Sequence, residues 1–169
     1  MKDKEIRACE HYLKPGHIFL SREPFIISAV LGSCVAVTLW DKKETYGGMA
    51  HFLYPSIQEK GKSTAQYGNV AVFHIVKMFL TEGAHKKNMK AQIFGGASLQ
   101  SLDCSRIARE NIRVARNTLM NFGINIISED VGGNVGRKLV YNTLTNEAII
   151  YRATKLRKGD WYPYMDEDR

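Results

Sequence analysis

Two stretches of this 169-residue chain carry apolar residues with the period of an α-helix, and they restrict the fold more than any other feature. They run over residues 66–82 and 105–122, and Gly83 and Gly123 follow them as helix-ending residues. Their apolar positions form one face each: Val72, Ile75, Val76, Phe79 and Leu80 in the first, and Ile107, Ile112, Ala115, Leu119 and Phe122 in the second. Since only one face of each predicted helix is apolar, each helix needs another layer to cover it.

Short runs of strand-forming residues predict that this layer is β-structure. The predicted strands lie at 17–32, interrupted at Pro24, and at 34–40, 46–54, 91–97, 124–130, 138–142 and 147–153, the last two as a hairpin. We therefore predict an α+β fold with the two main helices packed on one side of the β-sheets. The chain is expected to form a single domain over residues 1–169, with a core at about 12–152 and a C-terminal tail at 153–169.

The three cysteines, Cys9, Cys34 and Cys104, are an odd number without paired spacing, which argues against a disulfide framework. The chain has no C-x-x-C or H-E-x-x-H motif, so we expect no structural or protease-type zinc site and no cofactor. Free cysteines predict a reducing compartment, hence the cytoplasm. We expect no signal peptide, and no apolar run reaches the roughly 18 residues of a membrane span.

The net charge of +7 predicts an acidic partner. Nucleic acid, an anionic membrane and an acidic protein surface all satisfy that condition, so charge alone does not choose among them. Nucleic acid is the weaker hypothesis, because the basic run at 85–90 is short and has no interleaved aromatic residues. We therefore expect neither a nucleic-acid partner nor insertion into a membrane.

A cysteine and a histidine fall on neighbouring predicted strands that a short polar turn connects. Cys34 follows Gly32-Ser33, and His51 lies in the next strand. If residues 42–43 formed a two-residue loop, Cys34 would stand directly opposite His51, where Cβ atoms are about 5 Å apart. A register shifted by two residues would pair His51 with Ala36 and leave Cys34 diagonal on the same face, whereas a shift by one would separate the two side chains.

Such a pair has the chemistry of a thiol hydrolase. The imidazole can take the thiol proton, so that a thiolate attacks a carbonyl and the imidazolium protonates the leaving group. A hydroxyl is expected to orient the imidazole, from Ser28 or Ser33 and less readily from Thr38, which lies further along the strand. Backbone N–H groups of Gly32, Ser33 and Cys34 are candidate oxyanion donors. The alternative is that Cys34 is only a small buried apolar residue, as free cysteines often are.

Two glycine-rich segments, FGGA at 94–97 and VGGNVGR at 131–137, are a second candidate feature. Neither matches the spacing of a dinucleotide-binding or P-loop motif. We therefore interpret both as tight turns between strands.

Several blocks resemble, in the same order, those of the chemoreceptor glutamine deamidase family (CheD). They are LGSCVAVTLWD at 31–41, YGGMAHFLYP at 46–55, QYGNVAVFHIVKMFLTEGA at 66–84, AQIFGGASL at 91–99, and the segment 115–152 with its D-x-G-G-x-x-G-R element. The resemblance covers about residues 12–152. It implies that the protein hydrolyses glutamine side chains to glutamate on the cytoplasmic helices of methyl-accepting chemotaxis receptors, and that ammonia is released.

The same resemblance implies roles for single residues. Cys34 matches the family nucleophile and His51 its general base, while Ser28 stands where the family usually has a threonine that helps orient the histidine. Gly95 and Gly96 are expected to help shape the cleft around Cys34. Some family members bind a CheC-type chemotaxis phosphatase, which is therefore a candidate partner.

Two other functions fit parts of the pattern. The protein could be a binding module that regulates a chemotaxis phosphatase with little or no catalysis, and Ser28 in place of threonine is the only sequence feature that favours it. It could also be a different thiol hydrolase, such as a peptidase, which the Cys-His chemistry permits.

Overall fold

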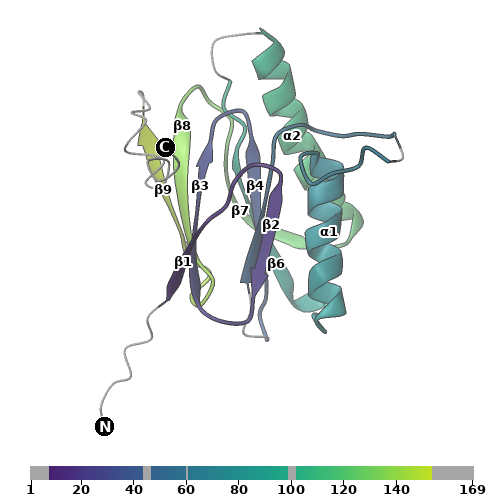
Figure 1. Ribbon diagram of the computed structural model, residues 1–169, viewed down its shortest axis with the longest axis vertical. Coiled ribbons are helices and arrows are strands. Elements are labelled where there is room, and N and C mark those ends of the chain that lie inside the picture. Colours follow the sequence, from purple (N-terminus) through teal and green to yellow (C-terminus); the bar gives the residue numbers. More distant parts are fainter. Residues whose placement is uncertain (1–7, 44–46, 60, 99–101, 154–169) are drawn as a thin grey trace, which may run out of the picture.

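Three layers make up the protein in the computed structural model, which describes residues 8–43, 47–59, 61–98 and 102–153. Over these residues, nine strands form a four-stranded and a five-stranded sheet, and two α-helices cover the outer face of the five-stranded sheet (Figure 1). The predicted α+β class is confirmed, and so is the packing of both helices on one side. Residues 154–169 of the predicted tail lie outside the described residues.

The four-stranded sheet has the order β1-β3-β8-β9. Its strands are β1 (Cys9–Tyr12), β3 (Phe25–Leu31), β8 (Gly136–Asn142) and β9 (Ala148–Ala153). β1 runs parallel to β3, and the other neighbouring pairs are antiparallel. The predicted hairpin of β8 and β9 is confirmed. β1 is a strand that the sequence does not predict, because CEHY has little strand-forming character and depends on its pairing with β3.

The five-stranded sheet has the order β2-β5-β4-β6-β7. Its strands are β2 (His17–Ser21), β5 (Gly47–Phe52), β4 (Val35–Asp41), β6 (Met89–Gly95) and β7 (Asn125–Val131). β4 and β5 are buried along their whole length, because each lies between two neighbouring strands and between two layers. Their side chains alternate between two cores: Val35, Val37 and Leu39 pack under the helices, and Ala36 packs against the four-stranded sheet.

The helices α1 (Gly68–Thr81) and α2 (Leu102–Asn121) bury the faces that the periodicity predicts. α1 begins two residues later than predicted because Tyr67, its N-cap residue, has an extended backbone. α2 begins three residues earlier, and Asp103 in its first turn is favourable at a helix N-terminus. Within the part of the chain described, neither helix has the length and apolar character needed to cross a membrane.

Candidate active site

Cys34 lies in the turn that joins β3 to β4, where the chain passes from one sheet to the other. The end of β6 holds this turn: the Cys34 carbonyl accepts a hydrogen bond from Gly96 N–H, and the Gly32 carbonyl accepts one from Ala97 N–H, both at 2.8 Å. The β4 ladder begins at Val35, so the turn rather than strand pairing sets the position of the thiol. Cys34 is a free cysteine and is partly exposed, a condition that reactive cysteines share.

Gly95 and Gly96 lie directly against the Cys34 turn. Both have positive φ angles, 105° and 68°, which favour glycine. A Cβ atom on Gly95 would lie 2.3 Å from the Cys34 carbonyl oxygen, and one on Gly96 would lie 2.6 Å from Cδ1 of Ile112. Only glycine therefore lets the end of β6 approach this closely, so the FGGA segment is a turn that shapes the surroundings of Cys34.

His51 lies on β5, fully buried, with Ala36 as its partner on β4. The register that puts Cys34 directly opposite His51 is therefore wrong, and the alternative shifted by two residues is the one that forms. The ladder pairs Trp40 with Gly47, whereas a two-residue loop at 42–43 would pair Trp40 with Thr45. Cys34 lies one residue before the paired strand. If the alternation of β4 continued into the turn, Cys34 would be a diagonal neighbour of His51 on the same face, about 7–8 Å away.

A single backbone group orients the His51 ring. Nδ1 lies 3.0 Å from the carbonyl oxygen of Leu13, and because a carbonyl can only accept, Nδ1 carries the proton. Nε2 consequently presents its lone pair, and it is buried without a hydrogen-bond partner among the described residues. Neutral His51 is therefore a base whose accepting nitrogen is available.

Burial holds both side chains in their neutral forms. It lowers the pKa of His51 from 6.5 to about 4, opposed by the hydrogen bond to Leu13 and assisted by His17, its partner on β2. Burial also raises the pKa of the Cys34 thiol, against hydrogen bonds from the backbone of Cys34 and Gly32. Both shifts favour the neutral thiol and the neutral imidazole over a thiolate–imidazolium pair.

Ser28 does not orient His51 through its hydroxyl, contrary to the prediction. Side chains alternate along β3, and Ile27 and Ala29 point into the core between the sheets. Ser28 therefore projects to the outer face, away from the side on which His51 lies. Its main chain contributes instead, because the Ser28 carbonyl accepts a 2.8 Å hydrogen bond from the N–H of Leu13, whose own carbonyl holds the His51 ring.

The other two candidate hydroxyls also lack this role. Ser33 lies in the turn beside Cys34, and the Thr38 hydroxyl donates to Oε1 of Gln92 at 3.0 Å. Sequence reasoning could not find Leu13, because the orienting group is a main-chain carbonyl, which every residue type carries.

Comparisons with known proteins match the chain to one family. The family described as CheD chemotactic sensory transduction matches residues 54–152. A probable chemoreceptor glutamine deamidase CheD of Trichlorobacter lovleyi is 38% identical over 145 residues, which are 85% of this chain and 90% of that protein. The chain belongs to the CheD family. A second CheD relative, from Methanosarcina barkeri, is 38% identical over 139 residues, covering 80% of this chain and 91% of that protein.

Among solved structures, this CheD-family chain is similar to a Bacillus licheniformis hypothetical protein, YfiH. The TM-score is 0.48 at 14% sequence identity, over 76% of this chain and 61% of that chain.

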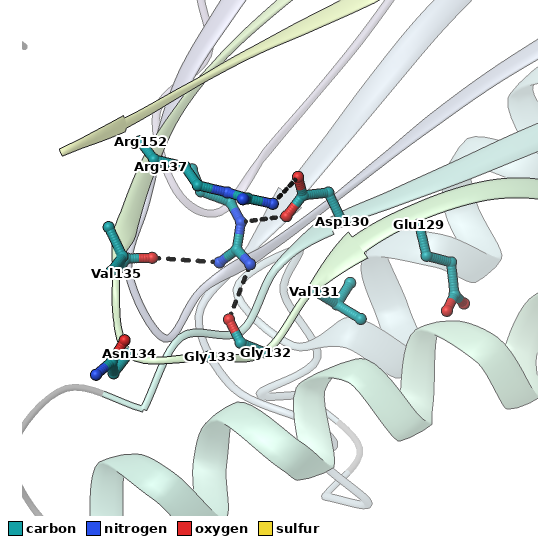
Figure 2. Close-up of a pocket in the computed structure, with 9 residues that line it drawn as sticks. All are labelled: Glu129, Asp130, Val131, Gly132, Gly133, Asn134, Val135, Arg137 and Arg152. Atoms are coloured by element: carbon teal, nitrogen blue, oxygen red, sulfur yellow. Dashed lines mark hydrogen bonds and ion pairs between the residues drawn. The ribbon is translucent and has the colours of Figure 1, made fainter.

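The D-x-G-G-x-x-G-R element of this CheD-family chain forms a braced turn beside the Cys34 region. Figure 2 shows the buried Arg137 guanidinium between the Asp130 carboxylate and two turn carbonyls. Nε donates to Asp130 Oδ1 and Nη2 to the Gly132 carbonyl, both at 2.8 Å, and Nη1 donates to the Val135 carbonyl at 3.3 Å. Gly132 N–H in turn donates to the Gly95 carbonyl at 2.9 Å, so this turn supports the segment that holds Cys34.

A cavity of about 430 Å³ opens at the same turn, lined by Glu129, Asp130, Val131, Gly132, Gly133, Asn134, Val135, Arg137 and Arg152. The guanidinium of Arg137 makes three hydrogen bonds to protein groups, which fits a structural turn rather than a phosphate site. Over the described residues, no group of three or more His, Cys, Asp or Glu side chains is placed to hold a metal ion.

Proposed function

We propose that this protein is a glutamine deamidase of chemotaxis receptors, with Cys34 as its nucleophile and His51 as its general base. The state of His51 carries the proposal. Its buried ring is held at Nδ1 by the Leu13 carbonyl, and Nε2 accepts no hydrogen bond among the described residues. Ala36, its partner on β4, lies two residues after Cys34. A neutral imidazole with an available nitrogen can take a thiol proton. The names of the CheD relatives, which are chemoreceptor glutamine deamidases, support the substrate class.

In the proposed reaction, the thiol proton moves to Nε2 of His51 while Cys34 Sγ attacks the side-chain amide carbon of the glutamine. The C–S bond forms, and the carbonyl oxygen takes negative charge near the backbone N–H groups of the turn at 32–34. The C–N bond then breaks, the imidazolium protonates the departing nitrogen, and ammonia leaves a thioester. Water gives a proton to Nε2 and attacks the thioester, so the C–S bond breaks and glutamate and the thiol are formed.

A chemotaxis receptor as substrate suits the charge of the protein. The chain carries a net charge of +7, and Arg106, Arg109 and Arg113 lie on the exposed face of α2. The same helix borders the Cys34 region, because Ile112 contacts Gly96. A basic surface steers an acidic substrate toward such a site at low salt. The proposal places the reaction on the cytoplasmic helices of the receptor, so the enzyme acts in the cytoplasm.

The alternative of a non-catalytic regulator of a CheC-type phosphatase rests on Ser28. Because the Ser28 hydroxyl projects away from His51, the replacement of threonine does not weaken the proposed base. A CheC-type phosphatase is retained as a proposed second partner, not as the primary function.

The test is to incubate the protein with a receptor cytoplasmic fragment in water enriched in heavy oxygen. Hydrolysis replaces the amide NH₂ with an oxygen from the solvent, so mass spectrometry of peptides locates each labelled glutamate. Wild-type protein should label particular glutamines, and Cys34→Ala should label none. A receptor fragment that remains unlabelled with wild-type protein, at several receptor sequences, would contradict the proposed function.

A further inference from the structure

One buried amide on α2 connects the two segments that carry Cys34 and His51. Asn111 is fully buried, and its Nδ2 group donates hydrogen bonds to the carbonyls of Ser33 and Leu53, each at 2.9 Å. Ser33 immediately precedes Cys34, and Leu53 follows β5 two residues after His51. A single side chain from a third element therefore sets the distance between the nucleophile turn and the strand of the base.

The bond to Ser33 also determines where the Cys34 N–H points. The peptide bond between Ser33 and Cys34 is planar, so the carbonyl and the N–H point in opposite directions. Asn111 draws the carbonyl toward α2, which turns the Cys34 N–H away from the helix. Burial raises the pKa of the Cys34 thiol, and the backbone of Cys34 is one of two groups that oppose this rise. The Cys34 N–H is also one of the proposed oxyanion donors.

The hydrogen-bonding groups of Asn111 suit the joining of two backbone segments better than they suit apolar packing. Its two N–H protons match the two carbonyls, whereas Oδ1 is buried without a hydrogen-bond partner among the described residues. An unpartnered buried oxygen is unfavourable, and a leucine of similar size would avoid it. Aspartate would place a carboxylate against two carbonyl oxygens and could donate neither bond.

We infer that Asn111 is a positioning residue of the deamidase site: by donating to Ser33 and Leu53 it sets the Cys34 turn against the His51 strand and aims the Cys34 N–H at the reacting atoms. This inference rests on the proposed function, since it assigns Asn111 a part in that reaction. Asn111 touches neither the substrate nor the sulfur, so it acts through the backbone at each end.

The test compares Asn111→Leu, which keeps the volume and removes both donors, with Thr38→Val as a matched control. Thr38→Val also removes one buried side-chain hydrogen bond, on β4, but touches neither Ser33 nor Leu53. At a temperature where both variants are folded, Asn111→Leu should lower kcat for receptor deamidation by roughly a hundredfold with little change in KM, because small misplacements of catalytic groups have effects of that order. Thr38→Val should keep kcat within about twofold. Asn111→Ala replaces the leucine variant if the latter does not fold.

A second readout separates this inference from the proposed function. Alkylation of Cys34 by iodoacetamide, followed against pH, measures the thiol without a receptor. Because the backbone of the Cys34 turn would lose the bond that orients it, its opposition to the raised thiol pKa should weaken. Asn111→Leu should therefore shift the alkylation profile to higher pH, and Thr38→Val should not. If wild-type protein deamidates receptors but a folded Asn111→Leu variant keeps both its kcat and its alkylation profile, the inference is overturned while the proposed function stands. If wild-type protein fails to deamidate but the profile still shifts, the proposed function fails and the positioning of Cys34 by Asn111 is supported.

Discussion

Along the middle of β4 and β5, the face under the helices buries only apolar side chains, whereas the face toward the four-stranded sheet also buries polar ones. Val35, Val37, Leu39, Ala50 and Phe52 join the core with α1 and α2. On the other face, Thr38 and His51 are fully buried beside Ala36 and Met49.

The difference shows how one sheet can separate stability from chemistry. Apolar burial is non-directional and tolerates any residue of suitable shape. A buried polar group needs a defined partner, such as Gln92 for Thr38 and the Leu13 carbonyl for His51. Substitution of His51, on the face between the sheets, is therefore expected to change protonation. Substitution of an apolar residue in the middle of the helix-covered core, away from Asn111, is expected to change mainly the free energy of unfolding.

The largest effect is expected at Cys34. Cys34→Ala and Cys34→Ser should each lower receptor deamidation by more than about 10⁴-fold without loss of fold, because a serine hydroxyl has a far higher pKa than one imidazole can offset. The rate of glutamate formation and a circular dichroism spectrum measure the two properties. Cys9→Ser and Cys104→Ser are the controls and should retain activity. Near-normal turnover by Cys34→Ser would exclude a thiol nucleophile.

His51→Gln should lower kcat by roughly 10²–10⁴-fold, because glutamine can still donate to the Leu13 carbonyl but cannot accept the thiol proton. Since burial raises the Cys34 pKa and lowers that of His51, alkylation of wild-type Cys34 should increase only in the alkaline range. The profile of His51→Gln should differ little from it. Rapid alkylation of the wild-type thiol at neutral pH, lost in the variant, would indicate a preformed ion pair instead.

A substitution on the helix-covered face should have the opposite signature. Phe79 on α1 is fully buried in that core, so Phe79→Ala should lower the free energy of unfolding by about 3–5 kcal/mol. Because Phe79 has no part in the proposed chemistry, kcat per folded molecule should stay within about twofold of wild type. Denaturant titration and kcat at low temperature test the two statements. A large fall in kcat with retained fold would show that the two faces are coupled.

Acid should weaken the face between the sheets through His51. Folding lowers the pKa of His51 from 6.5 to about 4, so between these two pH values the unfolded chain binds more protons than the folded one. The contribution of His51 to the free energy of unfolding is therefore fully present above pH 6.5 and is lost as the pH falls toward 4. The loss attributable to His51 is about 3 kcal/mol. His51→Gln lacks this titration, so its free energy of unfolding should fall less between the two pH values. Parallel denaturation curves for both proteins over that range would refute the assignment.

The smallest effect is expected at Ser28. Because its hydroxyl projects to the outer face, Ser28→Ala and Ser28→Thr should both deamidate within about threefold of wild type at equal folded concentration. A loss of ten- to a thousandfold in the alanine variant would return the hydroxyl to the site, as the resemblance to CheD implies.

The elements of the fold follow from the sequence to a large extent. The helical period of residues 66–82 and 105–122 predicts α1 and α2, and the strand-forming runs predict every strand except β1. Local pattern suffices there because each element is decided mainly by neighbouring residues. β1 is not predicted because its own residues have little strand-forming character. It forms a strand through its pairing with β3, which lies further along the chain.

By itself, the sequence determined that Cys34 and His51 belong to two neighbouring strands, and it placed the two side chains on one face in two of the three registers considered. Tertiary structure decided the rest. The pairing of β4 with β5 selected the register, and the alternation of β3 turned Ser28 outward. The Leu13 carbonyl came to hold the His51 ring, and the Asn111 amide came to join the segments that carry Cys34 and His51. The physical reason is that a backbone carbonyl has no sequence signature, and the side chain that reaches it comes from an element far away in the chain.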